Sequence, residues 1–174
     1  MSFLDQFSIR FTNLKPGAYH YELLIDDKFF ENFSGSEIKQ GRVNVRIELQ
    51  KQVKMLVLDF KLEGTVNLIC DRCLDDFDFS IFSTNKLVVK IGIGKIEETD
   101  EIIMIPETEH KINVAQFIYE YIHLALPPKR THPEDENGFP FCNKEIIEKL
   151  KEHKNKEINE VDPRWDVLKN LNLN

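Results

Sequence analysis

The chain has 174 residues, of which 41% are hydrophobic and thirteen are phenylalanine, so it is long enough for one domain with an aromatic-rich core. Its net charge of −7 disfavours autonomous binding to RNA or DNA, because phosphate recognition usually needs a basic surface. Residues 1–5 lack the pattern of a secretory signal, and no run of about 18 apolar residues predicts a membrane span, so we expect a cytoplasmic protein with reduced cysteines and no membrane partner.

The first half of the sequence shows the two-residue alternation of β-strands. Apolar residues alternate over residues 7–11, 19–25, 43–49, 56–62, 66–70, 77–81 and 87–91. Asp26 is placed to cap a short helical turn that carries Phe29, Phe30 and Phe33. Gly64 interrupts one alternating run and predicts a bulge or bend. Hairpins at this spacing predict an antiparallel sheet, or a partly open barrel, with one buried face.

The second half changes to helical periodicity. A helix is expected from Asn113 to Leu126, where two prolines end it, and its apolar stripe should pack on the sheet. A long loop, a short helix and a polar linker follow over residues 127–160. A last helix should begin at Asp162-Pro163. The predicted fold is therefore α+β, with a core domain over residues 1–126, the connecting segment 127–160 and a C-terminal docking helix over residues 161–174.

The string Cys70-Asp71-Arg72-Cys73 lies between two expected strands. Two thiols three residues apart on a tight turn can both contact one small target, which suits a tetrahedral soft metal such as zinc or a redox dithiol. Cys142 offers a third ligand, and His132 is the most economical fourth. Only the fold can bring these two halves together, and the cost of closing such a long loop does not forbid it.

Two other interpretations of the cysteines remain open. Cys70 can continue the inward face of its strand as a small hydrophobic residue, with Cys73 at the turn. A thiol oxidoreductase is the second alternative, although no helix pattern follows Cys73 to lower the pKa of its thiol. The carboxylates of Asp71, Asp75 and Asp76 would also raise the pKa of a neighbouring thiol.

Basic residues on the expected strands offer a candidate phosphate-binding strip. Its members are Arg42, Arg46, Lys51, Lys54 and Arg72. The solvated outer face of a half-buried strand is the favoured explanation of these residues. No arrangement of nucleophile and base, glycine-rich phosphate loop or metalloprotease string is present in the sequence, so we assign no catalytic residue and no small-molecule substrate.

The string Asp162-Pro163-Arg164-Trp165 has the features of a detached docking element. A polar linker precedes it, and Trp165 would anchor a short apolar ridge in a groove of a partner. The alternative is that this helix folds back on its own domain and buries Trp165.

Taken in order, these strings resemble the YceD-like family, the large ribosomal RNA subunit accumulation proteins. The resemblance is carried by Phe29-Phe30, Cys70-Asp71-Arg72-Cys73, Leu126-Pro127 and the closing Asp162-Pro163-Arg164-Trp165, and it spans nearly the whole chain. Many members carry further cysteines after the Leu-Pro pair, which implies a zinc site. This sequence departs from that pattern, because Glu136, Asn137 and Pro140 stand where other members place thiols.

The resemblance implies a non-enzymatic factor that supports synthesis, processing or stability of large-subunit ribosomal RNA. Such a factor would dock onto a pre-ribosomal particle or an assembly protein, with Arg72 and Arg164 presented to that partner. A thiol oxidoreductase that uses Cys70 and Cys73, and a protein-binding adaptor unrelated to ribosomes, are the alternatives.

Overall fold

The computed structural model describes residues 3–92, 102–134, 136, 138 and 141–157, and the chain divides into two compact units. Unit 1 comprises Met1–Leu68 and Asp76–Arg130, and unit 2 comprises Ile69–Asp75 and Thr131–Asn174. The segment expected to form the C-terminal docking helix lies outside the described residues. In the part of the chain that the structure describes, no helix is long and apolar enough to cross a membrane.

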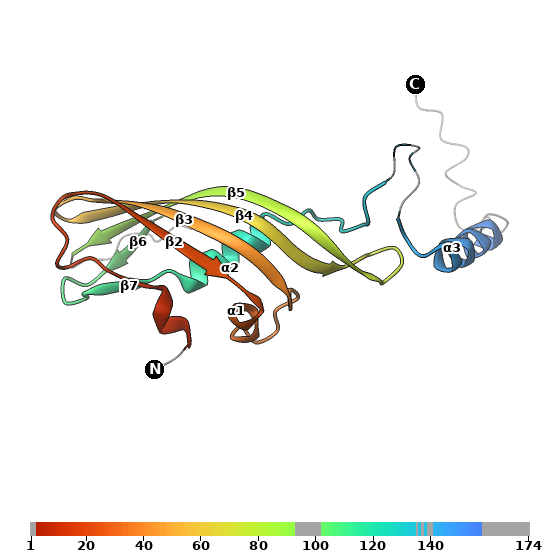
Figure 1. Cartoon of the computed structure of the whole chain (residues 1–174), viewed down its shortest axis with the longest axis horizontal. Helices are drawn as coiled ribbons and strands as arrows, with labels where there is room; N and C mark the ends of the chain where they lie inside the picture. Colours follow the sequence, from red (N-terminus) through yellow and green to blue (C-terminus); the bar gives the residue numbers. More distant parts are fainter. Residues whose placement is uncertain (1–2, 93–101, 135, 137, 139–140, 158–174) are drawn as a thin grey trace, which may run out of the picture. The chain divides into compact units, whose positions relative to one another are not determined.

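Unit 1 is built on a five-stranded sheet with the strand order β2-β3-β4-β5-β6 (Figure 1). The strands are β2 (Gly17–Ile25), β3 (Gly41–Lys51), β4 (Met55–Ile69), β5 (Asp76–Ile91) and β6 (Ile102–Ile105). β3 pairs antiparallel with β2 and β4, whereas β6 pairs parallel with β5. The α+β class is thus confirmed. The purely antiparallel sheet was a wrong prediction, and the described strands do not close into a barrel.

Gly64 lies within β4 without interrupting it. The register of β3 and β4 runs unbroken through the pair Val43 and Gly64, so the predicted bulge is absent. A Cβ atom on Gly64 would lie 2.6 Å from the Cα atom of Val43, so only glycine permits this approach of the two backbones. The alternation continues across it, and Leu62 and Val66 are both fully buried.

A two-stranded antiparallel sheet and two short helical segments complete the N-terminal part of unit 1. The sheet pairs β1 (Ser8–Arg10) with β7 (Lys111–Asn113), and the helical segments are η1 (Phe3–Phe7) and α1 (Asp27–Glu31). Phe29, on α1, makes an edge-to-face contact with Phe7 at 5.0 Å between ring centroids. The expected helical turn after Asp26 is therefore present, and its phenylalanines enter the core.

Helix α2 (Ala115–Leu124) packs on one face of the five-stranded sheet (Figure 1). Its first turn is held by Asn113, whose Oδ1 atom accepts a hydrogen bond of 2.9 Å from the backbone N–H of Ala115. Ile118 is fully buried, and Tyr121 contacts Phe60 of β4 edge-to-face at 5.2 Å. The helix is shorter at both ends than the predicted span of residues 113–126.

Candidate metal centre

Residues 69–75 form the turn of unit 2 that carries the first two cysteines. The backbone N–H of Cys70 donates to the carbonyl of Asp75, and the N–H of Leu74 donates to the carbonyl of Cys70, both at 2.9 Å. The N–H of Arg72 points at the sulfur of Cys70, with 3.4 Å between the two atoms. These bonds hold Cys70 and Cys73 on the same side of the turn, and both side chains are buried.

The other two candidate ligands come from residues 131–142, which also belong to unit 2. Pro133 follows His132 directly and favours an extended backbone at the histidine. The N–H of Phe141 donates to the carbonyl of Pro133 at 3.1 Å, which brings Cys142 back toward His132. Helix α3 (Lys144–Glu157) then begins, with Asn143 accepting a hydrogen bond from the N–H of Glu145.

The ligand atoms of Cys70, Cys73, His132 and Cys142 all lie within 4.8 Å of one another. With usual zinc–ligand lengths, a tetrahedral site requires about 3.8 Å between two sulfur atoms and about 3.6 Å between a sulfur and a nitrogen. Here the sulfurs of Cys70 and Cys142 are 3.8 Å apart. The Nδ1 atom of His132 lies 3.4 Å from the sulfur of Cys73 and 3.6 Å from that of Cys142. The donor set and its spacing therefore fit a tetrahedral metal ion.

The environment separates the pKa values of the thiols. Burial raises the pKa of Cys70, but the hydrogen bonds of Cys73, Arg72 and His132 outweigh it and lower this pKa to about 6. Burial, and then the neighbouring sulfurs of Cys70 and Cys73, raise the pKa of Cys142 to about 11. The sequence-based prediction that nearby carboxylates raise the thiol pKa is therefore wrong for Cys70. Because a cysteine binds a metal ion as the thiolate, a site that already favours the thiolate of Cys70 favours the binding of a cation.

A lowered thiol pKa also occurs in redox dithiols, and it does not favour an oxidoreductase here. In the described structure no helix begins at Cys73, because the chain turns and enters β5 instead. A third cysteine and a histidine complete the cluster, and its four side chains are all buried or half-buried. A dithiol that exchanges electrons with a partner needs an accessible sulfur.

The candidate binding residues occupy different parts of the molecule. Arg42 and Arg46 are exposed on the outer face of β3 in unit 1, where Arg46 lies 3.6 Å from the carboxylate of Glu22. Arg72 is half-buried between the two cysteines of the unit 2 turn. Asp162, Arg164 and Trp165 lie outside the described residues.

Sequence reasoning missed the exposed apolar side chains beside the ligands. Ile69 precedes Cys70, Leu74 follows Cys73 and Phe141 precedes Cys142, with exposed fractions of 56%, 75% and 66%. Leu74 also has φ = 64°, a left-handed conformation that bulky side chains rarely adopt. A sequence signal existed, because each of the three cysteines has a large apolar neighbour.

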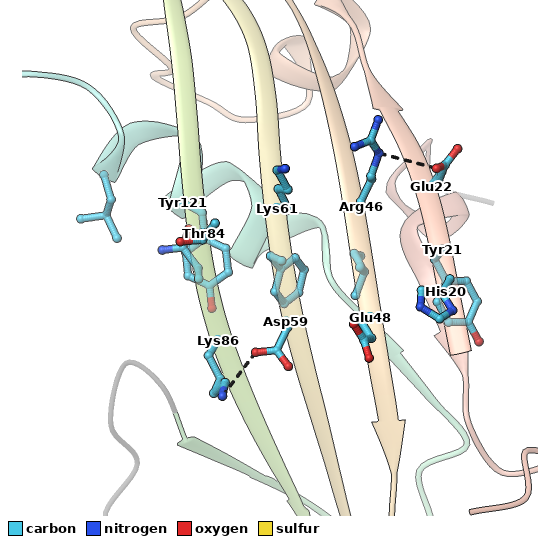
Figure 2. A pocket seen from close by; sticks show the side chains of 14 residues that line it. His20, Tyr21, Glu22, Arg46, Glu48, Asp59, Lys61, Thr84, Lys86 and Tyr121 are labelled. Carbon is cyan, nitrogen blue, oxygen red and sulfur yellow. Dashed lines mark ion pairs between the residues drawn. The ribbon is translucent and has the colours of Figure 1, made fainter. Parts of the chain in front are cut away.

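A depression of about 760 Å³ is lined by residues of β2, β3, β4 and β5 together with Tyr121 and Leu124 of α2, and its lining contains two ion pairs (Figure 2). Asp59 forms an ion pair of 3.4 Å with Lys86, and Glu22 lies beside Arg46. No cysteine lines this depression. Its charges are those of a solvated sheet face.

Comparison with known proteins identifies a family. A family model described as "Large ribosomal RNA subunit accumulation protein YceD" matches residues 58–172, which is well over half of the 174 residues. No curated protein and no solved structure matches the chain. The matched range begins within β4 and includes all four residues of the cysteine–histidine cluster.

Proposed function

Because the chain belongs to the YceD family of large ribosomal RNA subunit accumulation proteins, we propose that it is a non-enzymatic factor that supports synthesis, processing or stability of large-subunit rRNA. The family match carries this proposal. The part of the chain that it covers contains Cys70, Cys73, His132 and Cys142, which could hold a metal ion. That cluster serves the function by holding a surface for recognition.

In this proposal Cys70, Cys73, Cys142 and His132 hold a zinc ion. Three thiolates and one imidazole are a usual ligand set for structural zinc, and four protein ligands leave no position for a reactive water. Among the residues of unit 2 whose burial the structure describes, only the three cysteines are buried. A unit with so little apolar core needs another source of stability, and a bound metal supplies it.

Docking would use the apolar side chains beside the ligands, Ile69, Leu74 and Phe141, which we call the knuckle rim. Each is one peptide bond from a cysteine, so the metal fixes all three around one point. The left-handed backbone of Leu74 costs about 1–2 kcal/mol, and a glycine there would avoid this cost. Leu74 is exposed and has a strained backbone, so its side chain does not contribute to a core. This supports a role of the side chain in binding a partner.

The charges around the knuckle rim favour a protein partner over direct contact with RNA. Glu134, Asp135 and Glu136 follow His132 in the sequence, and Asp75 is exposed at the end of the turn. Carboxylates repel phosphates and attract basic protein surfaces. The partner is therefore a basic protein of the pre-ribosomal particle or of its assembly machinery, with Arg72 and the Arg164–Trp165 segment as additional contacts.

Depletion of the protein tests this function. Large-subunit rRNA should fall relative to small-subunit rRNA, and the wild-type chain should restore it. The Cys70→Ser variant should fail to restore it and should lose stoichiometric zinc in elemental analysis. Unchanged rRNA and ribosome profiles after depletion would contradict the proposal.

A second pair of variants tests the knuckle rim without removing a metal ligand. Leu74→Ser should retain zinc but restore large-subunit rRNA poorly. Val53→Ser is the matched control, because Val53 is 84% exposed and lies in unit 1, on the turn between β3 and β4. Full restoration by Leu74→Ser would show that docking uses another surface.

A further inference from the structure

Strand β2 forms one edge of the five-stranded sheet, and no other strand in the described part of the chain pairs with its outer side. It is nine residues long and pairs with β3 in an unbroken register from Gly17 to Ile25. Within β2 there is no proline, lysine or bulge, which are among the devices that protect an exposed edge from another strand, and Glu22 is its one acidic residue. Such an edge offers a template for β-strand addition.

The direction of the free backbone groups follows from the hydrogen bonds around β3. The N–H of Gln52 donates to the carbonyl of Met55, and the N–H of Asn67 donates to the carbonyl of Gln40. Even-numbered residues of this strand therefore bond to β4 and odd-numbered residues bond to β2. Since Tyr21 pairs with Ile47, the odd-numbered residues of β2 face β3. The N–H and C=O groups of its even-numbered residues, Ala18, His20, Glu22 and Leu24, point to the free edge.

We propose that β2 pairs antiparallel with β2 of a second copy of this chain, in a two-fold symmetric register centred on Tyr21. Of the symmetric registers, the one centred on Tyr21 pairs all nine residues of the strand. It places His20 of one copy opposite Glu22 of the other, and Ala18 opposite Leu24. The even-numbered residues then meet each other, which gives about eight intermolecular backbone hydrogen bonds.

The side chains of β2 complement themselves in this register. On the outer face, the imidazole of His20 meets a carboxylate, and Leu24, which is 49% exposed, gains an apolar neighbour. On the inner face, Tyr19 meets Leu23, and both are only half-buried in the single chain. A register centred on Glu22 would instead place two carboxylates opposite each other, which opposes pairing.

The first test is the mass of the full chain by sedimentation equilibrium over a wide concentration range. We expect a reversible rise from 20.5 kDa toward twice that mass. In His20→Pro the outward N–H is lost while the bonds to β3 remain, so association should weaken about tenfold or more with an unchanged circular dichroism spectrum. His20→Ala is the control, because it keeps the backbone donor and should still associate. A monomer at all concentrations, or a His20→Pro variant that associates like wild type, would overturn the proposal.

The second test fixes the register. In the proposed pairing residue 21 meets its own copy about 4.5 Å away between Cα atoms, so Tyr21→Cys should form an intermolecular disulfide in a glutathione buffer. In Leu23→Cys the two thiols are about 13 Å apart along the strand, so this matched variant should remain uncrosslinked. The wild-type chain controls for its three native cysteines. Equal crosslinking of both variants, or none of Tyr21→Cys, would overturn the proposed register.

Discussion

Gly64 is a residue whose role depends on having no side chain. The backbone atoms that a Cβ would meet belong to β3, a strand paired on both sides, so they cannot move aside as a flexible side chain would. Gly64→Ala should therefore lower the free energy of unfolding by about 3 kcal/mol, through strain and separation of the strands. Chemical denaturation of the full chain measures this change.

The matched control for this substitution is Gly92→Ala. A Cβ on Gly92 meets no atom within 4 Å, so its free energy of unfolding should change by less than about 0.5 kcal/mol. Similar losses in both variants would mean that the close approach at Gly64 is not the cause.

In the metal-free chain, the thiols of Cys70 and Cys142 should ionise at well separated pH values. Cys70, with its pKa lowered from 9.0 to about 6, should become a thiolate first, whereas Cys142, with its pKa raised to about 11, should stay protonated until alkaline pH. Thiolate absorbance near 240 nm, followed against pH, measures both. The step near pH 6 should disappear in Cys70→Ser, and its persistence there would assign it to another group.

These shifts have opposite effects on stability. The pKa of Cys70 is lower in the folded chain, so its contribution is present above pH 9 and is lost as the pH falls through 6. The pKa of Cys142 is higher in the folded chain, so its contribution is present below pH 9 and is lost as the pH rises toward 11. A bound cation would remove this opposition, because it favours the thiolate of every cysteine ligand.

At the level of elements, the long strands were predictable because burial on one face leaves a period of two. Leu56, Leu58, Phe60 and Leu62 show it without interruption. β6 was not predictable in this way, since all four of its residues are half-buried and carry no alternation. β7 has three residues, which is too short for any periodicity. The parallel partner of β5 was missed for this reason.

The cysteine cluster could be proposed from the sequence because thiols and imidazoles are few and their chemistry is narrow. His132 can be proposed as the fourth ligand only because it is a histidine in the long loop before Cys142, and the structure places it beside the cysteines. The left-handed conformation of Leu74 could not be anticipated, because leucine has no preference for it. The closing turn of residues 70–75 imposes it.

Helix α2 stabilises unit 1 through its apolar stripe. Ile118→Ala should lower the free energy of unfolding by about 3 kcal/mol, because Ile118 is fully buried and its truncation leaves a cavity. Leu124→Ala, on the same helix, should cost less than about 0.5 kcal/mol, since Leu124 is 75% exposed. Thermal or chemical denaturation compares the two variants, and equal losses would mean that the burial of Ile118 is not the cause of its effect.

On the scale of the whole molecule, the two units have different sources of stability. Unit 1 has an apolar core that includes Phe29, Phe60 and Ile118, all fully or almost fully buried. The described part of unit 2 buries its three cysteines and no other side chain. All four candidate ligands belong to unit 2, so metal binding is coupled to the order of that unit alone.

Removal of the metal should therefore loosen one unit and leave the other intact. After treatment with a strong chelator, backbone amides of residues 69–75 and 131–142 should exchange hydrogen faster, while amides of β3 and β4 should keep their protection. Hydrogen exchange followed by mass spectrometry resolves the two regions, and added zinc should reverse the change. Cys142→Ser should resemble the chelated chain even in zinc, whereas Val53→Ser should resemble wild type. Equal loss of protection in β3 and β4 would mean that the metal stabilises the whole chain, because the sheet would then depend on the same four ligands.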